Sequence, residues 1–281
     1  QYRLTLLVLY SVMVLNSKHM RVTVLIPTYN EKENITKLLN ELLQRFKKLP
    51  KHTFSILIVD DNSPDGTGKI VKQFSQRYKN IYLLSGKKAG LGKAMIRGYK
   101  YALSKLKPDI VVTNEADFGF SFKHLSLMLG KIKQGVDVVV ASRHVGDGRS
   151  DGWTLNRKLN HFIANTFFAG TIAGVTQVHD KNGAFRAIRV KDVLDKINFD
   201  KLPSQGFGFF FYLLYELSKV TDKFFEFPSV FTFRTVGESK VSFNPKYVKT
   251  YLGDIAEYIK LAFKIRLERS KQSLAPFDKQ M

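Results

Sequence analysis

Two carboxylates one residue apart, Glu115 and Asp117, have the side-chain type and spacing that metal chemistry requires. They follow residues 110–113, a β-branched run typical of a strand that is buried on both faces. In an open α/β sheet, ligands collect beyond the carboxyl ends of the strands, which is where these acids fall. Carboxylate oxygens placed there can hold a hard divalent cation against a diphosphate. A polar strand end that only faces water is the alternative interpretation.

The elements that would position these acids alternate along the chain. Strands are predicted at 22–26, 54–59, 81–84, 110–113 and 136–141, and helices at 32–47, around 70–74 and at 93–106. This alternation predicts an α/β fold whose mostly parallel sheet is covered by helices on both faces, as in Rossmann-like domains. Polar clusters end strand after strand, so we expect them to converge on one edge of the sheet. Later in the chain, an apolar helix is predicted at 206–219 and a strand at 224–234.

The composition points to an anionic partner. The chain of 281 residues has a formal net charge of +21, which suits nucleic acid, an anionic membrane face or a phosphorylated substrate. The charge is spread along the sequence, and this favours a generally basic surface over a nucleic-acid-binding module. The sequence contains no cysteine, so disulfides are excluded.

The two ends of the chain carry possible membrane contacts. The apolar run at 4–15 is shorter than the about 20 residues that span a bilayer. Residues 1–19 are therefore predicted as an N-terminal extension that is either a weak anchor or an additional packing element. Residues 245–281 are predicted as a basic amphipathic helix and a tail, with the helix either on an anionic membrane or packed on the domain. The domain between them spans 20–244.

Several polar segments occur in a recognisable order. They are Pro27-Thr28-Tyr29-Asn30-Glu31, the acidic turn 60–67, Gly90-Leu91-Gly92-Lys93-Ala94, the Glu115/Asp117 pair, Ser142-Arg143, the segment 180–186 and the segment 233–240 with Gly237-Glu238-Ser239-Lys240. This set resembles the family 2 glycosyltransferases of the GT-A fold, and within them the dolichyl-phosphate mannose synthases and other polyprenyl-phosphate glycosyltransferases. The resemblance covers about 22–242.

The resemblance implies an enzyme that transfers one sugar, with inversion, from a nucleotide-sugar to dolichyl or polyprenyl phosphate. Mannose from GDP-mannose is the first expectation and glucose from UDP-glucose the second. The enzyme would work at the cytoplasmic face of a membrane as a peripheral or weakly anchored protein. It would not bind nucleic acid.

The resemblance also assigns the donor and metal residues. The residues expected to bind the nucleotide-sugar are Pro27, Tyr29, Glu31, Asp60, Asp61, Lys93 and Glu115. Asp61 is the preferred contact to the base, although either aspartate could instead cap the turn that follows. Glu115 and Asp117 would bind Mg²⁺ or Mn²⁺.

Cations are expected around the acceptor phosphate. The residues expected to bind the acceptor phosphate are Arg143, Arg157, Arg234, Ser239 and Lys240. The residues expected to act in catalysis are Asp117, Arg143, Arg234 and Lys240. A phosphate monoester is mostly dianionic at neutral pH because its second pKa is ~6. No protein general base is therefore expected, and the cations must position two anions against each other.

The metal motif departs from that of the relatives, which usually show Asp-x-Asp and then Gln two residues later. Here the set is Glu115, Asp117 and Gly119, which leaves the identity of the ion open. The six histidines show no ligand spacing and are interpreted as structural or surface residues. Three alternative functions remain: transfer to a glycan acceptor, non-catalytic binding of a nucleotide-sugar, and nucleic-acid binding, which rests on charge alone.

Overall fold

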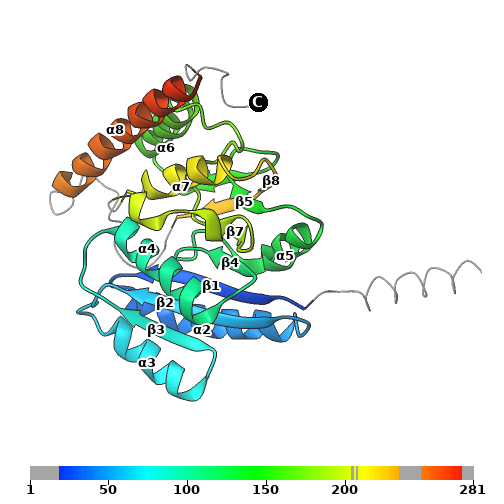
Figure 1. Ribbon diagram of the computed structural model, residues 1–281. Coiled ribbons are helices and arrows are strands. Elements are labelled where there is room, and N and C mark those ends of the chain that lie inside the picture. Colours follow the sequence, from blue (N-terminus) through cyan, green and yellow to red (C-terminus); the bar gives the residue numbers. More distant parts are fainter. Residues whose placement is uncertain (1–18, 204–205, 207, 234–247, 274–281) are drawn as a thin grey trace, which may run out of the picture.

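Seven strands form the central sheet of the computed structural model, which describes residues 19–203, 206, 208–233 and 248–273. The strand order is β3–β2–β1–β4–β7–β5–β8 (Figure 1). Six of these strands run parallel to one another wherever they pair: β1 (Arg21–Thr28), β2 (Thr53–Asp60), β3 (Ile81–Ser85), β4 (Ile110–Thr113), β5 (Val138–Ser142) and β8 (Phe224–Pro228). β7 (Arg186–Arg189) is antiparallel to both of its neighbours. The predicted α/β fold with a mostly parallel sheet is confirmed.

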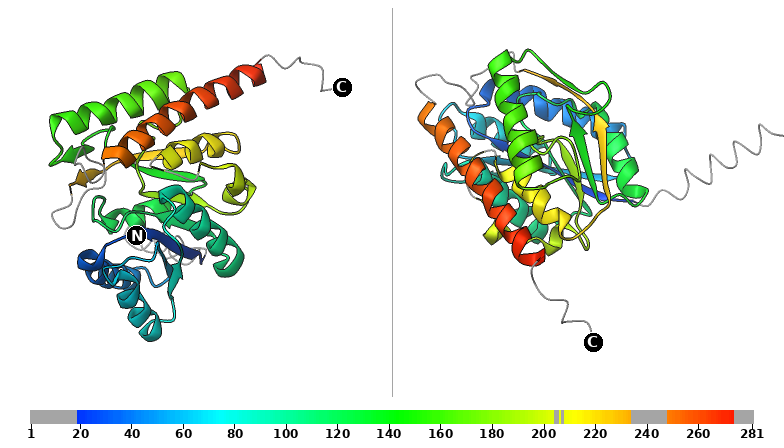
Figure 2. Two further views of the ribbon diagram at one scale, coloured as in Figure 1. Left: turned by 90° about the vertical axis from the view of Figure 1, so that its left-hand side faces the viewer. Right: turned by 90° about the horizontal axis from the view of Figure 1, so that it is seen from above.

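Helices cover both faces of this sheet (Figures 1 and 2). They are α2 (Lys32–Lys47), α3 (Thr67–Arg77), α4 (Leu91–Tyr101), α5 (Leu125–Lys133), α6 (Leu155–Phe162), α7 (Gly208–Ser218) and α8 (Val248–Ser273). Two π-helical segments extend α4 and α6, namely η1 (Ala102–Leu106) and η3 (Ile163–Ile172). Three short 3-10 turns are η2 (Phe122–His124), η4 (Leu194–Lys196) and η5 (Phe199–Lys201).

Alternate residues of the strands enter two separate cores, one on each face of the sheet. Val24 and Ile26 of β1 pack with the apolar side of α2, and Leu25 between them packs with α4 and α7. This is the period of two that a strand imposes on its side chains. α4 lies unusually close to the sheet at Gly98, because a Cβ there would be 2.8 Å from the side chains of Leu25 and Val59. A helix so placed fixes the loop that precedes it relative to the strand ends.

α6, η3 and α8 form a layer over one end of the sheet. Figure 2 shows α6 and α8 side by side in both views, and α8 contacts both η3 and α7. The predicted C-terminal helix is confirmed, and its packing on the domain is one of the two alternatives left open by the sequence. Among the helices of the described residues, none is long and apolar enough to cross a bilayer.

Two predicted elements differ from the structure. The helix predicted at 93–106 begins at Leu91 and changes to π-helix at Ala102, and it ends at Lys107, whose φ is 48°. The strand predicted at 224–234 is broken at Ser229, whose N–H donates to the Ser142 carbonyl at 2.7 Å. After that break, β9 (Val230–Thr232) leaves the main sheet and pairs with β6 (Arg149–Asp151). The apolar run at 4–15 lies outside the described residues.

Candidate active site

The predicted site residues of β4 and β5 meet at the carboxyl edge of the sheet. Glu115 and Asp117 follow β4, and Arg143 follows β5. Asp117 and Arg143 are buried, whereas Glu115 is half-buried and lines a pocket together with Arg143. These three residues thus follow strands that end at one edge of the sheet, as predicted.

A tight turn holds the acidic pair in place. The Asn114 side chain donates to the Phe120 carbonyl at 3.0 Å and accepts from the Glu115 N–H at 2.9 Å. Asp117 Oδ1 accepts from the Gly119 N–H at 3.0 Å, and Phe118 between them has a φ of 61°. A left-handed conformation is rare for a bulky residue and is typical of functional sites. The turn therefore presents two carboxylates on a strained, hydrogen-bonded scaffold.

The structure explains why glycine stands at position 119. A Cβ on Gly119 would lie 2.3 Å from the ring of Phe231 and 3.1 Å from Asp117 Oδ1. Phe231 belongs to β9 and also contacts Phe120 edge to face. The aromatic ring thus occupies the space that a glutamine side chain at position 119 would need. Of the Asp-x-Asp-x-Gln pattern of the relatives, this chain keeps only the two carboxylates, Glu115 and Asp117.

Arg143 is fixed by a buried ion pair with Asp180. Its Nε and Nη2 donate to the two oxygens of the Asp180 carboxylate, each at 2.7 Å. The Arg143 N–H adds a third hydrogen bond at 3.1 Å, and the Gly183 N–H adds a fourth at 3.0 Å. Burial alone would raise the pKa of Asp180, but Arg143 outweighs this effect and holds the pKa well below its usual range. Asp180 is therefore a permanent anion that orients the guanidinium.

Trp153 brings the two predicted arginines together. The Arg143 guanidinium lies 5.2 Å from the Trp153 ring and the Arg157 guanidinium 4.8 Å from it. Arg143 is also 5.6 Å from the rings of both Phe120 and Phe231. Cation–π contacts of this kind stabilise guanidinium groups where water is scarce. Within the described residues, the buried Trp153 Nε1 has no hydrogen-bond partner.

A pocket of about 210 Å³ is lined by this cationic cluster and by apolar side chains. Its polar and aromatic lining includes Glu115, Arg143, Arg157, Trp153 and His161. The apolar walls come from two helical segments: Ile163, Ala164 and Phe168 of η3, and Ile255 and Ile259 of α8. Two hydrogen bonds tie α8 to the pocket, because Tyr258 donates to Asn182 at 2.9 Å and Asn160 donates to Tyr251 at 3.4 Å.

The predicted donor-side residues lie at the ends of β1 and β2. Asp60 accepts from the Thr28 hydroxyl at 2.9 Å and from the Ser63 hydroxyl at 2.6 Å, so it is the aspartate that caps the turn. Asp61 accepts from Arg97 at 2.8 Å. Asp65 accepts hydrogen bonds from the N–H and the hydroxyl of Thr67 within the same turn.

The other donor-side predictions are placed as follows. Glu31 is buried and its Oε2 accepts from the Asn34 amide at 2.8 Å, whereas Pro27 is half-buried within β1. Lys88 lies over the Tyr29 ring at 3.8 Å, and Lys93 is exposed in the first turn of α4. None of the residues Asp60, Asp61 and Lys93 lines the pocket described above.

Three predicted residues of the acceptor side, Arg234, Ser239 and Lys240, lie outside the described residues. The contacts of Trp153 and Asp180 with Arg143 were not predicted from the sequence, although Asp180 belongs to the recognised segment 180–186. The six histidines were predicted to be structural or surface residues, and the structure adds that His144 and His161 contact each other at 2.9 Å between their Nε2 atoms. No sequence signal reveals this pair, since the two residues lie on separate elements.

Comparison with known proteins identifies the family of this chain. The model of the family described as "Glycosyl transferase family 2" matches residues 23–195. A polyprenol monophosphomannose synthase from Mycolicibacterium smegmatis is 32% identical over 226 residues, which are 79% of this chain and 81% of that protein. A dolichol-phosphate mannosyltransferase from Pyrococcus furiosus is 30% identical over 243 residues, which are 86% of this chain and 64% of that protein.

The fold has solved counterparts. The crystal structure of mannosyl-3-phosphoglycerate synthase from Rubrobacter xylanophilus superposes with a TM-score of 0.59 at 17% sequence identity, over 92% of this chain and 77% of that one. At this low sequence identity, the similarity between the two structures shows a shared fold and nothing about function. The family match and the identity with the two transferases together show that this chain belongs to glycosyltransferase family 2.

Proposed function

We propose that this enzyme transfers mannose from GDP-mannose to a polyprenyl phosphate such as dolichyl phosphate, with inversion at the sugar carbon. The relatives named above are mannose transferases that act on polyprenol or dolichol phosphate, as is an undecaprenyl-phosphate mannosyltransferase from Micrococcus luteus at 31% identity. The three names share mannose and a polyprenyl acceptor, and these relatives support mannose over glucose.

The pocket is the observation that carries this proposal. An acceptor of this class has a phosphate at one end and an isoprenoid chain at the other. The pocket combines the same two chemistries, because Arg143 and Arg157 line it together with apolar side chains of η3 and α8. Arginine suits a phosphate because its planar guanidinium can donate two hydrogen bonds at once. A free saccharide would leave the apolar side chains of the pocket without a partner.

The residues of the site suit a reaction between two anions. The acceptor phosphate needs no proton removed, since it is mostly dianionic near neutral pH. Arg143 would draw the phosphate into position, and Asp180 keeps that guanidinium from reorienting. Trp153 supports the second cation, Arg157, on the same pocket. Charge-assisted contacts of this type are worth about 1.5–3 kcal/mol each.

Glu115 and Asp117 would hold a divalent cation against the diphosphate of the donor. Two carboxylates on a fixed turn match the oxygen ligands that Mg²⁺ and Mn²⁺ prefer. The crowding of Gly119 by Phe231 leaves no room for a third side-chain ligand there, so water and donor oxygens would complete the coordination. The ion would neutralise the departing nucleoside diphosphate. Buried Glu31 and Asp61 remain proposed contacts to the nucleoside.

α6, η3 and α8 are the proposed contact with the lipid surface. Eight of the ten large hydrophobic side chains exposed in the described residues lie on them: Leu155, Leu159, Phe162, Ile163, Phe167, Leu252, Phe263 and Leu267. Exposed lysines accompany them, including Lys158, Lys249 and Lys260. Apolar side chains bordered by cations suit an anionic membrane face. These helices also form the pocket walls, so the acceptor could enter from the membrane.

A matrix of donors and acceptors tests the proposal. The full chain, with Mg²⁺ or Mn²⁺, is offered GDP-mannose or UDP-glucose together with a polyprenyl phosphate, the same polyprenol without phosphate, or a lipid-free saccharide. We expect product only with GDP-mannose and the phosphorylated lipid. Transfer to the saccharide would favour a glycan acceptor. Transfer of glucose would indicate that UDP-glucose is the donor. Donor binding without any transfer would indicate a non-catalytic nucleotide-sugar binder.

A further inference from the structure

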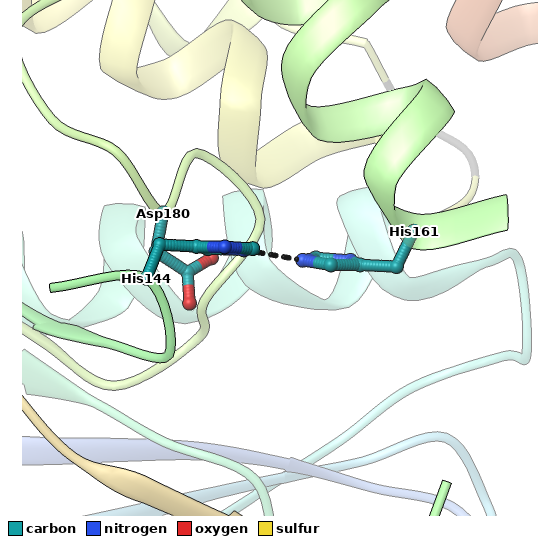
Figure 3. Close-up of side chains that lie close together, drawn as sticks. All are labelled: His144, His161 and Asp180. Carbon is teal, nitrogen blue, oxygen red and sulfur yellow. Dashed lines mark hydrogen bonds between the residues drawn. The ribbon is translucent and has the colours of Figure 1, made fainter. Parts of the chain in front are cut away.

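His144 and His161 form a pair of imidazoles that the proposed transfer reaction does not use. His144 follows Arg143 in the loop after β5, and His161 lies in the last turn of α6. Their Nε2 atoms are 2.9 Å apart and their rings are nearly parallel, with an interplanar angle of 9° (Figure 3). Asp180 lies beside them, and one ligand atom from each of the three residues falls within 4.8 Å of the others.

The two rings are in the neutral form that a metal ion needs. Burial lowers the pKa of His161 to about 3, and the nearby Arg143 adds to this effect. Burial also lowers the pKa of His144, and Arg143 and Lys181 reinforce the shift. Both rings are therefore neutral near pH 7, with a lone pair available on each imidazole. Neutral imidazole is the commonest nitrogen ligand for Zn²⁺ and related transition metals.

The charges around the pair permit a cation. Arg143 is the nearest positive group, but both oxygens of Asp180 are bonded to it and offset its charge. The carboxylates of Asp180 and Glu226 both act on His144 in the direction that favours positive charge there. Because Asp180 is already saturated by Arg143 and by backbone N–H groups, it supplies charge to the site and is not needed as a direct ligand.

We propose that His144 and His161 together bind one transition-metal ion of the Zn²⁺ class, at a site separate from the oxygen-rich pair Glu115 and Asp117. The ion would replace the hydrogen bond between the two rings by two metal–nitrogen bonds. The proton on the donating Nε2 would move through solvent to Nδ1 of the same ring, which stays neutral, and no oxidation state changes. Two protein ligands leave the remaining positions of a tetrahedral ion to water or to an anion. The ion would join the loop after β5 to α6, which carries one side of the acceptor pocket.

One experiment can distinguish the proposed imidazole site from the carboxylate pair Glu115 and Asp117, because the two sites prefer different metal ions. Excess Mg²⁺ fills carboxylate sites but does not compete for imidazole. The full chain without a histidine tag is stripped of metal, saturated with Mg²⁺, and titrated with ZnCl₂ by calorimetry and with Co²⁺ by visible absorption. We expect one ion per chain. His144→Gln and His161→Gln should each lower the affinity by about tenfold or more, by analogy with other losses around metal sites. His19→Gln, which changes an exposed histidine, should leave it unchanged.

Two further measurements guard against misfolding of the variants. In the wild-type protein, Zn²⁺ should shift the imidazole NMR signals of His144 and His161 and leave those of the other histidines in place. Zn²⁺ should also raise the melting temperature of the wild type and of His19→Gln, but not of the two paired-histidine variants. Absence of Zn²⁺ binding in excess Mg²⁺, or binding that survives both substitutions, would overturn the proposal and leave the pair as an ordinary hydrogen bond. Neither result bears on sugar transfer, which is assayed separately.

Discussion

The Arg143 guanidinium and the Asp180 carboxylate meet through two hydrogen bonds of 2.7 Å, with side chains that are 6% and 0% exposed. Arg143 comes from the end of β5, and Asp180 from the loop that leads into β7. The pair therefore joins the edge of the sheet to the recognised segment 180–186. Removing one partner of a buried pair costs about 3–5 kcal/mol because the other charge stays behind unpaired. An Arg143→Ala variant would consequently combine lost catalysis with lost stability.

Arg143→Lys separates these two effects. Lysine keeps the positive charge opposite Asp180 but cannot donate two parallel hydrogen bonds. We expect transfer to polyprenyl phosphate to fall by roughly tenfold or more, while the affinity for GDP-mannose changes little. Steady-state kinetics and donor titration measure the two quantities, and Arg149→Lys, at an exposed position of strand β6, is the matched control. If donor affinity falls in parallel with transfer, Arg143 serves the nucleotide diphosphate and not the acceptor.

Trp153 should report on acceptor binding directly, because it is the only tryptophan in the chain. Its ring supports Arg143 and Arg157, and its Nε1 is a buried donor that a phosphate oxygen could satisfy. We expect a water-soluble short-chain prenyl phosphate to change the intrinsic fluorescence. Trp153→Phe keeps an aromatic face and should raise KM for the acceptor by a few-fold, whereas Trp153→Leu should raise it by roughly tenfold.

The controls for Trp153 follow from its position. Donor affinity should be unchanged in both variants, since the effect is confined to the acceptor pocket. A fluorescence response to GDP-mannose but not to the prenyl phosphate would place this pocket on the donor side.

The acidic pair predicts a specific metal dependence. Asp117→Asn should abolish transfer and remove the part of donor binding that depends on Mg²⁺ or Mn²⁺, because an amide binds a hard cation far less well than a carboxylate. Glu115→Asp, which restores the Asp-x-Asp pattern, should remain active. Donor calorimetry with and without metal makes the measurement. Full metal-dependent activity in Asp117→Asn would contradict the assignment of these residues.

The exposed apolar side chains of α6 and α8 predict membrane binding. Phe162 and Phe263 are 57% and 50% exposed, so the double change to Asp should leave the core intact. We expect it to reduce sedimentation with vesicles of anionic lipid at low salt, and to preserve activity on a soluble short-chain acceptor. Leu127→Asp on α5, also an exposed apolar position, is the control and should still sediment. Undiminished sedimentation of the double variant would locate the membrane contact elsewhere.

Asp254 of α8 predicts a pH-dependent stability. Burial raises the pKa of this carboxyl to about 6, and Glu257 contributes to the shift. The folded-state value exceeds the ~4 of an unfolded chain, so folding favours the protonated acid. The stability gained in this way is present below pH ~4 and is lost as the pH rises toward 6.

The variant Asp254→Asn tests this directly. It should be more stable than the wild type near pH 7, by about 1 kcal/mol after allowance for partial exposure, and equal to it near pH 4. Urea unfolding at the two pH values gives the comparison. Asp222→Asn, at an exposed acid, should show no such difference. An equal effect of Asp254→Asn at both pH values would mean that lost contacts, and not titration, determine its stability.

The sequence by itself determined the parallel strands, the helices between them and the acidic pair, because these depend on local patterns. Hydrophobic runs such as 110–113 identify strands, and the carboxyl ends of parallel strands must share an edge. The break at Ser229 and the antiparallel β7 could not be predicted, since both depend on which strand lies alongside.

The tertiary structure alone decided which side chains act together. Asp180 lies 37 residues from Arg143 in the chain, and His161 lies 17 residues from His144, so no spacing rule links either pair. Their contacts arise because the loop after β5, the segment before β7 and helix α6 converge at one end of the sheet. The reason for glycine at position 119 is likewise tertiary, because the ring that excludes a side chain there, Phe231, comes from the distant strand β9. Local sequence thus specified the elements, and long-range packing specified the site.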